Sequence, residues 1–343
     1  MTATIKNLTS ITHNGLTLPK VIPQLTFADK LGGCKARWAI ARMKYTVEPG
    51  IYAVGNPTDQ SPVLVSANYK LSFDFLRKEL TGIDAWIMVI DTNGINVWCA
   101  AGKGTFGTAE IVRRIESVEL NKIVSHRKII LPQLGGVGVA AHKVKKQSGF
   151  MVIYGPVRAR DIKAFIDAGN KATPDMRQVH FTLYDRLVLT PVEFTISAKY
   201  ALFIIAAMFL LSGINKQGYS TQLTLENGFR AVFNVMTAYL GGTVIAPLFL
   251  PWLPGTSFSV KGFYVGLLLA AALSLTGYTG TQLETLAWIL LVTAITSFTA
   301  MNFTGASTYT SLSGVNKEMK RAIPFQLTAA VAGLVIWIIT RFI

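Results

Sequence analysis

The sequence predicts an α/β domain followed by an all-α transmembrane domain of about five helices. Three observations support this prediction. First, the charged residues are concentrated in the first part of the chain, because residues 1–199 carry 26 of the 33 Lys and Arg residues and 15 of the 18 Asp and Glu residues. Second, short apolar runs alternate with helical patterns between residues 46 and 190, which is typical of α/β folds. Third, the chain after residue 197 contains five apolar stretches close to the ~20 residues that cross a bilayer.

The composition excludes several classes of protein. Only 15% of the 343 residues are charged, whereas about a quarter are charged in a typical soluble domain. The mean hydropathy of +0.41 likewise argues against a wholly soluble enzyme and against a disordered chain. Two cysteines, Cys34 and Cys99, are too few for a disulfide framework or a structural zinc site. Residues 1–14 are polar, so we expect no cleaved signal peptide.

The globular part is expected to consist of an N-terminal arm, residues 1–45, and an α/β domain, residues 46–190. The arm is expected to hold one short helix at 35–44. The continuous apolar run 85–91 is typical of a strand buried on both faces, and we therefore expect a parallel sheet. The predicted strands are 51–54, 62–66, 85–91, 128–131 and 150–154, and the predicted helices are 69–80, 108–119 and 161–168.

The transmembrane domain is expected to cover residues 197–343. Its second apolar stretch contains Gly241, Gly242 and Pro247, so we expect its end to be broken or kinked. The five expected spans are 198–214, 231–250, 261–279, 285–303 and 324–342.

Positive charge predicts the orientation of these spans. The expected loop 304–323 carries Lys317, Lys320 and Arg321, which places this loop and the globular domain in the cytoplasm, whereas Arg341 counts weakly against that orientation. We therefore expect a multi-pass protein of the cytoplasmic (inner) membrane. The net charge of +15 suits a domain held against an anionic leaflet, and because no recognition-helix pattern is present we expect no nucleic-acid partner.

The segment 96–107, which follows the central predicted strand, is the most informative part of the chain. A cysteine, Cys99, stands beside a tryptophan and is followed by small residues and a Gly-Lys-Gly turn. One interpretation is a buried structural cysteine in a hairpin, because 92–94 is a turn signal. A phosphate-binding loop fails the pattern twice, at Val97 and at Gly104. Residue patterns alone leave helix and strand open here.

The octapeptide Asn96–Lys103 resembles the cap-helix signature of the mercury-methylating corrinoid membrane proteins. The apolar spans and the polar stretch 302–314 resemble the same proteins, which carry a membrane domain. Further segments resemble the corrinoid-binding domain of the corrinoid iron–sulfur proteins of the acetyl-CoA pathway. These segments are 50–57, 61–65, 67–70, 91–94 and 124–128.

The resemblance implies a Rossmann-like corrinoid-binding domain in which the octapeptide forms a cap helix under the corrin ring. Cys99 would then be the catalytic residue and the lower axial ligand of cobalt, and Asn96 would be a favoured N-cap. The Asp-x-His-x-x-Gly signature of His-ligated cobalamin is absent from the sequence. The residues expected to contact the corrinoid are Ser66, Asn68, Asn96, Val97, Trp98, Cys99, Ala100, Ala101, Gly102, Lys103, Thr105, Pro132, Gln133, Gly135 and Gly136.

The activity implied by the resemblance is that of a corrinoid-dependent methyltransferase. It would pass a methyl group from a methylated folate-type donor, or that donor's methyltransferase, through cobalt to Hg(II), making methylmercury. Because the chain has only two cysteines, its reductant would be a partner, a ferredoxin-like protein with two iron–sulfur clusters.

Two alternatives stay open. The chain could be a membrane-anchored corrinoid methyl carrier of acetyl-CoA-type one-carbon metabolism, or a non-catalytic corrinoid-binding module. We expect the spans to serve as an anchor in the lipid bilayer and as a docking platform for partners. The Ser/Thr-rich run 304–313 is either a docking loop or a polar connection.

Overall fold

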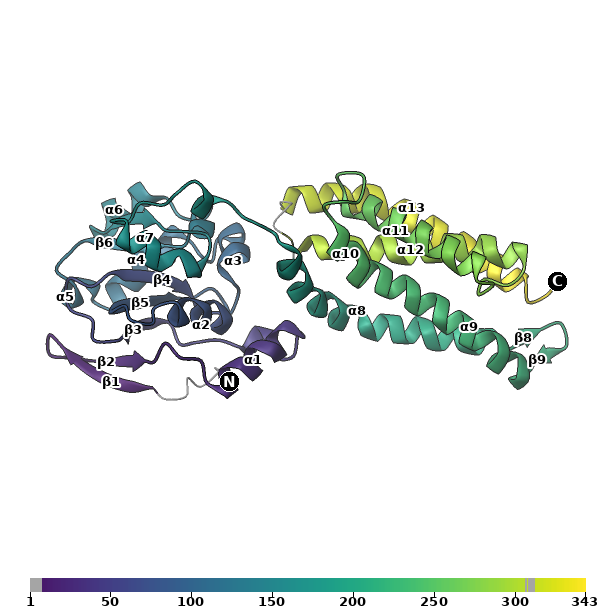
Figure 1. Ribbon diagram of the computed structural model, residues 1–343, viewed down its shortest axis with the longest axis horizontal. Coiled ribbons are helices and arrows are strands. Elements are labelled where there is room, and N and C mark those ends of the chain that lie inside the picture. Colours follow the sequence, from purple (N-terminus) through teal and green to yellow (C-terminus); the bar gives the residue numbers. More distant parts are fainter. Residues whose placement is uncertain (1–7, 306, 308–311) are drawn as a thin grey trace. The chain divides into compact units, whose positions relative to one another are not determined.

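The computed structural model describes residues 8–305, 307 and 312–343, and the chain divides into two compact units, residues 1–180 and 181–343 (Figure 1). Each unit is built around apolar clusters of its own. Residues 306 and 308–311 of the polar run 304–313, named above as a docking loop or connection, lie outside the described residues, as does the start of the N-terminal arm.

The first unit contains a seven-stranded sheet in the order β1-β2-β3-β5-β4-β6-β7. Strands β5, β4, β6 and β7 are parallel to one another, but β3 runs antiparallel to β5. The expectation of a wholly parallel sheet is therefore wrong at the β3–β5 pair. Only residues 55–62 connect β3 to β4, which lies on the far side of β5, and this connection is too short for the crossover that would make the two strands parallel. The strands are β1 (Thr9–His13), β2 (Leu16–Val21), β3 (Gly50–Val54), β4 (Val63–Ala67), β5 (Ala85–Ile90), β6 (Lys128–Leu131) and β7 (Met151–Tyr154).

The N-terminal arm is part of this sheet. Its β1–β2 hairpin turns at Asn14 (φ 48°) and Gly15 (φ 76°), and this Asn-Gly pair is the sequence signal for a two-residue hairpin. The expected helix at 35–44 lies earlier, as α1 (Phe27–Arg37), because Thr26 forms a capping box with Asp29. A short 3₁₀ turn, η1 (Arg42–Lys44), follows it.

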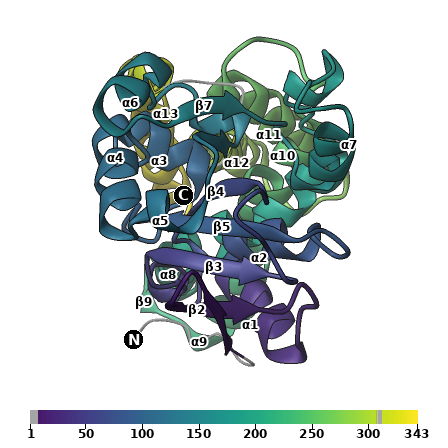
Figure 2. The ribbon, with the colours of Figure 1, turned by 90° about the vertical axis from the view of Figure 1, so that its left-hand side faces the viewer.

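Helices cover both faces of the sheet. Helices α4 and α6 lie on one side and α2 and α7 on the other (Figure 2). Neighbouring residues of β5 alternate between the two layers: Trp86 packs with the α4 side and Ile87 with the α2 side, and both are fully buried. The helices are α2 (Lys70–Lys78), α3 (Val97–Lys103), α4 (Thr108–Ser117), α5 (Leu120–Ile123), α6 (Ala141–Ser148) and α7 (Ile162–Asp167), with 3₁₀ turns η2 (Gln133–Gly135), η3 (Ala159–Asp161) and η4 (Asp175–Arg177).

The second unit contains five helices that are long and apolar enough to cross a membrane by length and composition. The first begins at Leu183 rather than near 198, because Thr182 and Asp185 form a capping box there. These helices are α8 (Leu183–Leu211), α9 (Thr221–Leu240) with its continuation η5 (Gly241–Ile245) and α10 (Ala246–Phe249), α11 (Phe258–Leu275), α12 (Gln282–Asn302) and α13 (Leu312–Ile339), with the short elements β8 (Ile214–Asn215), β9 (Gly218–Tyr219) and η6 (Phe303–Gly305).

The irregular end expected for the second span is confirmed. The helix opens into a π-helical turn at Gly241–Ile245, just before Pro247. A Cβ at Gly242 would overlap the hydroxyl of Thr299 in α12, so the glycine permits close helix packing.

Three basic residues of this unit lie in surroundings that differ from those expected from the sequence. Lys317 and Lys320 lie in the first turns of α13 rather than in a loop, because the helix begins several residues before its apolar part. Arg341 forms an ion pair with Glu284, and its guanidinium lies 5.2 Å from the centre of the Trp337 ring. Its positive charge is thus paired within the unit.

Candidate functional site

The candidate site lies at the carboxyl ends of the parallel strands. After β4 the chain passes to the side of α2, whereas after β5 and β6 it passes to the side of α3, α4 and α6. In α/β folds, ligands bind where the connections diverge in this way. Three segments meet this description in the first unit: residues 68–69, 91–96 and 132–138.

Asn68 holds the turn that leads into α3. Its side-chain oxygen accepts hydrogen bonds from the backbone N–H groups of Thr92 (3.1 Å) and Gly94 (3.0 Å) and from the Thr92 hydroxyl (2.8 Å). Its amide nitrogen donates to Asp91 (3.0 Å). Because Asn68 is buried and these bonds engage both ends of its amide, it acts within this structure as a positioning residue.

The octapeptide forms helix α3, and the hairpin interpretation is therefore wrong. The side-chain oxygen of Asn96 accepts a hydrogen bond of 2.9 Å from the backbone N–H of Cys99, which is a standard N-cap. The helix ends where Gly104 adopts φ 83°, a left-handed conformation that favours glycine. Cys99 therefore lies in the first turn of a short helix that is capped at its N-terminus and closed by Gly104 at its C-terminus.

The two faces of α3 differ in character. Ala100 and Ala101 are buried in the core, whereas Cys99 is half-exposed and Gly102 is exposed. A Cβ at Gly102 would meet nothing within 4 Å, and its φ is not left-handed. A helical glycine costs about 0.5–1 kcal/mol relative to alanine, so packing gives no reason for this one. Helical spacing places this open position, which we call the glycine patch, beside Cys99 and Trp98, three and four residues earlier in the chain.

The loop after β6 packs directly against α3. A Cβ at Gly138 would overlap the carbonyl oxygen of Phe106 and lie 3.1 Å from the Cα of Ala101. A Cβ at Gly135 would lie 2.5 Å from the Phe106 ring. Gly138 thus lets backbone approach backbone, and Gly135 lets the loop approach the Phe106 ring. Gly138 was missed by the sequence analysis, although the run 135–138 contains three glycines and signals such an approach.

Several predicted contact residues already have partners within the chain. Ser66 is buried and donates to the carbonyl of Ala67 (3.2 Å), and Thr105 donates to the carbonyl of Ala100 (3.4 Å). The side-chain oxygen of Gln133 accepts a 2.6 Å hydrogen bond from Arg177.

The structure brings α3 together with the loop after β6. Asn68 and Ser66 belong to the buried framework beside them. Pro132, Gly136, Val97 and Lys103 lie within these two segments. The contact of each predicted residue with a cofactor stays a prediction.

The surroundings of the site are fixed by two polar groups that the sequence analysis did not single out. Glu110 accepts a 2.9 Å hydrogen bond from the backbone N–H of Asp91 and pairs with Arg114 at 3.0 Å. Tyr154 donates to the carbonyl of Val139 (2.7 Å), and burial raises the pKa of its hydroxyl. Both groups tie the strand ends to the neighbouring loops.

The arrangement suits a large planar cofactor that carries its own metal. Cys99 is the side chain that could hold the metal of such a cofactor, and its thiol would supply a soft sulfur donor. The open position at Gly102 would let a flat group approach the helix backbone.

Part of the first unit is similar to known proteins. Residues 13–166 match the family described as CO dehydrogenase/acetyl-CoA synthase delta subunit. The corrinoid/iron-sulfur protein large subunit of Moorella thermoacetica is 32% identical over 124 residues, which cover 36% of this chain and 27% of that protein. The acetyl-CoA decarbonylase/synthase complex subunit gamma of Methanopyrus kandleri is 31% identical over 123 residues, covering 35% and 26%. The gamma subunit of Archaeoglobus fulgidus is 28% identical over 128 residues, covering 37% and 27%.

The region of similarity ends before α8, and the alignments span about a quarter of the length of these relatives. Residues 13–166 are thus similar to subunits of acetyl-CoA decarbonylase/synthase complexes and to a corrinoid protein. The region contains all of the candidate site residues.

Proposed function

We propose that the first unit binds a corrinoid and serves as a methyl carrier of acetyl-CoA-type one-carbon metabolism, anchored to a membrane by the second unit. One observation carries the proposal: α3 presents the Cys99 thiol beside the open patch at Gly102, in a region similar to a corrinoid/iron-sulfur protein. The five apolar helices support the anchoring role.

In this proposal a bound corrinoid supplies cobalt, which can accept and release a methyl group. Cys99 would provide the axial sulfur donor, which is soft and strongly donating. The Asn96 cap holds the turn that carries Cys99, and Asn68 holds the turn before it. Gly102 allows the helix to approach the ring. Since the chain has only two cysteines, its electrons would come from a partner with iron–sulfur clusters.

A second candidate function is methylation of Hg(II) as the acceptor. Two features favour it: the octapeptide Asn96–Lys103 resembles the signature of mercury-methylating corrinoid membrane proteins, and it forms a helix with Cys99 in its first turn. A thiolate that held the cobalt would donate electron density to it, which would suit methyl transfer to an electrophilic acceptor such as Hg(II).

Methyl transfer from an isotopically labelled methylfolate tests both functions. The full chain, supplied with corrinoid, a folate methyltransferase and a low-potential ferredoxin, is offered either Hg(II) or an acetyl-CoA synthase together with carbon monoxide and coenzyme A. Label in acetyl-CoA supports the carrier, and label in methylmercury supports the second candidate. Cys99→Ala should abolish transfer to Hg(II), whereas Cys34→Ala should leave it unchanged because Cys34 lies on the exposed side of α1. A chain that binds corrinoid and passes label to neither acceptor would overturn both proposals in favour of a binding module.

A further inference from the structure

The segment 27–45, formed by α1, η1 and the turn between them, exposes an unusual amount of apolar surface. We define the α1 face as the side chains of Phe27, Leu31, Cys34, Trp38, Ile40 and Met43. The exposed fractions are 79% for Phe27, 44% for Leu31, 56% for Ile40 and 60% for Met43. Clustered large apolar side chains of this kind mark a binding surface more often than scattered ones do.

The first four of these side chains lie along one side of α1 and its C-cap, and Ile40 and Met43 follow after the helix ends. Phe27, Leu31 and Cys34 stand at helical spacings of four and three residues, and Trp38 follows one turn later. The opposite side carries Asp29, Gly33 and Ala36, which are buried. The usual pattern of a surface helix is therefore inverted, with the charged carboxylate inside and the apolar stripe outside.

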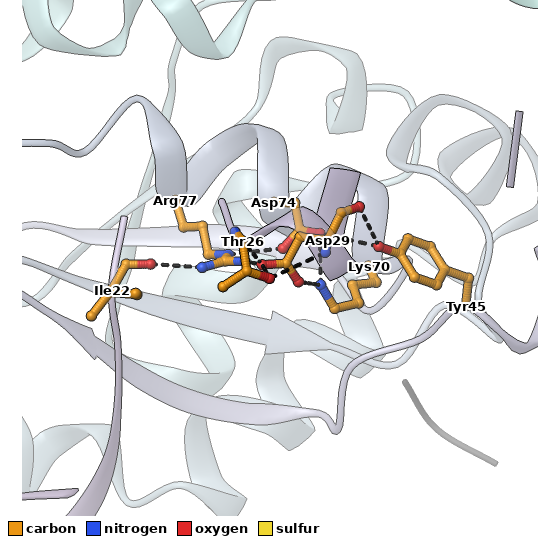
Figure 3. A network of polar contacts seen from close by, with 7 residues as sticks. All are labelled: Ile22, Thr26, Asp29, Tyr45, Lys70, Asp74 and Arg77. Atoms are coloured by element: carbon orange, nitrogen blue, oxygen red, sulfur yellow. Dashed lines mark hydrogen bonds and ion pairs between the residues drawn. The ribbon is translucent and has the colours of Figure 1, made fainter. Parts of the chain in front are cut away.

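A buried ion network holds α1 in this orientation (Figure 3). Asp29 pairs with Lys70 at 2.5 Å and with Arg77 at 2.8 Å, and Asp74 of α2 pairs with the same two cations at 2.7 and 2.8 Å. All four side chains are at most 4% exposed. Burial by itself would raise the pKa of Asp29, but hydrogen bonds from Lys70 and Thr26 outweigh it and hold that pKa far below its usual range. The helix is thus fixed by charge pairing, which leaves its apolar side free to face outward.

The turn after α1 keeps the remaining apolar side chains outside. Ala39 and Ala41 both adopt left-handed backbone conformations, with φ 57° and φ 51°. Such conformations are uncommon for residues other than glycine and cost free energy. They flank Ile40, which is more than half exposed. The chain therefore maintains a strained turn that presents an apolar side chain to its surroundings.

The charge around the α1 face is strongly positive. Segment 27–45 contains five basic residues and one acidic residue, and the acidic one is Asp29, which the ion network already neutralises. Lys30, Lys35 and Lys44 are exposed around the apolar stripe. An apolar helix side bordered by lysines is the pattern of segments that lie in the headgroup region of anionic membranes.

We propose that the α1 face binds the surface of an anionic lipid bilayer, with Phe27, Leu31 and Ile40 entering the headgroup region and Lys30 and Lys35 contacting lipid phosphates. The charge of the segment favours lipid over a protein partner, because three exposed lysines border the stripe and no exposed carboxylate lies within it. The same chain carries five helices that suit a bilayer, so a membrane surface would be present at high effective concentration.

The test uses the full chain in lipid nanodiscs that hold one copy each. A Cys99→Ser variant leaves Cys34, on the α1 face, as the one thiol for an environment-sensitive fluorophore. Quenching by lipids with a nitroxide on the acyl chain then reports contact with the bilayer. The matched control carries the fluorophore at the exposed position 147 of α6, on the other side of the sheet, as Gln147→Cys in a Cys34→Ser, Cys99→Ser chain.

We expect strong quenching at position 34 in discs that contain phosphatidylglycerol, weaker quenching in pure phosphatidylcholine, and none at position 147. Lys30→Gln and Lys35→Gln, which each remove one positive charge, should each weaken the contact about fivefold. Leu31→Glu should weaken it without unfolding the unit, because Leu31 is exposed. Equal quenching at positions 34 and 147, or none at position 34, would overturn the proposal. Shielding of position 34 from aqueous iodide without lipid quenching would also overturn it and would indicate that another part of the chain covers the α1 face.

Discussion

The substitution Gly102→Ala separates the role of this residue in the fold from its role toward a ligand. A Cβ at Gly102 meets nothing within 4 Å, so alanine introduces no clash in the protein itself. Alanine favours the helix by about 0.5–1 kcal/mol over glycine. We therefore expect α3 to become more stable in the absence of corrinoid, by about that amount.

Binding of a corrinoid should change in the opposite direction. The added methyl group projects about 1.5 Å from the helix, on the side that carries Cys99. A ring held away by that distance loses dispersion contacts with the helix surface, and we expect an affinity loss of about tenfold, or about 1.4 kcal/mol. Amide hydrogen exchange of α3 in the full chain measures the first effect, and spectral titration with hydroxocobalamin measures the second.

Gly104→Ala is the matched control, two residues along the chain. Gly104 adopts φ 83°, where an alanine is strained by about 1–2 kcal/mol, so its α3 amides should exchange faster rather than slower. If Gly102→Ala slowed exchange and left the corrinoid affinity unchanged, the patch beside Cys99 would not be the corrinoid contact and the reasoning would be refuted.

Three further predictions concern the framework of the two units. Asn68→Ala should lower the free energy of unfolding by about 1–3 kcal/mol, because the backbone N–H groups of Thr92 and Gly94 lose their acceptor. Hydrogen exchange should then be faster in α3. The control Asn121→Ala, at an exposed position, should have no effect. Asp29→Asn should lower the free energy of unfolding by about 3–5 kcal/mol, against less than about 0.5 kcal/mol for Glu119→Gln in an exposed pair. Folding lowers the pKa of Asp29, so the ionised Asp29 carboxylate should stabilise the fold fully at pH values above its ordinary pKa of 3.8. This stabilisation should decline as the pH falls below that value. Thermal melts of the wild-type and Asp29→Asn chains at several pH values would detect the decline. A reporter fused to Ile343 should lie outside the cytoplasm, and a cytoplasmic signal would contradict the orientation inferred from the positive charges.

Local patterns predicted most elements of the first unit. Apolar runs such as 85–91 lie where strands form, and helical spacing predicted α2, α4 and α7. The sheet was predicted less well, because pairing depends on contacts between distant segments. The antiparallel β3 follows from the short connection 55–62, and the β1–β2 hairpin follows from Asn14-Gly15, so both signals were present in the sequence.

The candidate site was predicted as a set of segments but not as a set of roles. Cys99 and Gly102 could be read from the octapeptide, whereas the buried hydrogen bonds of Asn68 depend on where β4 and β5 bring their ends. The approach of Gly138 to Ala101 likewise requires the tertiary fold. The ion pairs of Asp29 join residues more than forty positions apart in the chain, and no local sequence pattern predicts them.

The absorption spectrum of the purified full chain with corrinoid tests the central claim most directly. The account predicts that wild type, Cys34→Ala and Cys99→Ala all bind the corrinoid, because the large ring and its substituents supply most of the contact. It predicts that only Cys99→Ala shifts the spectrum, because only that change removes an axial sulfur donor. A wild-type chain that binds no corrinoid, or a Cys99→Ala spectrum identical to that of wild type, would contradict it.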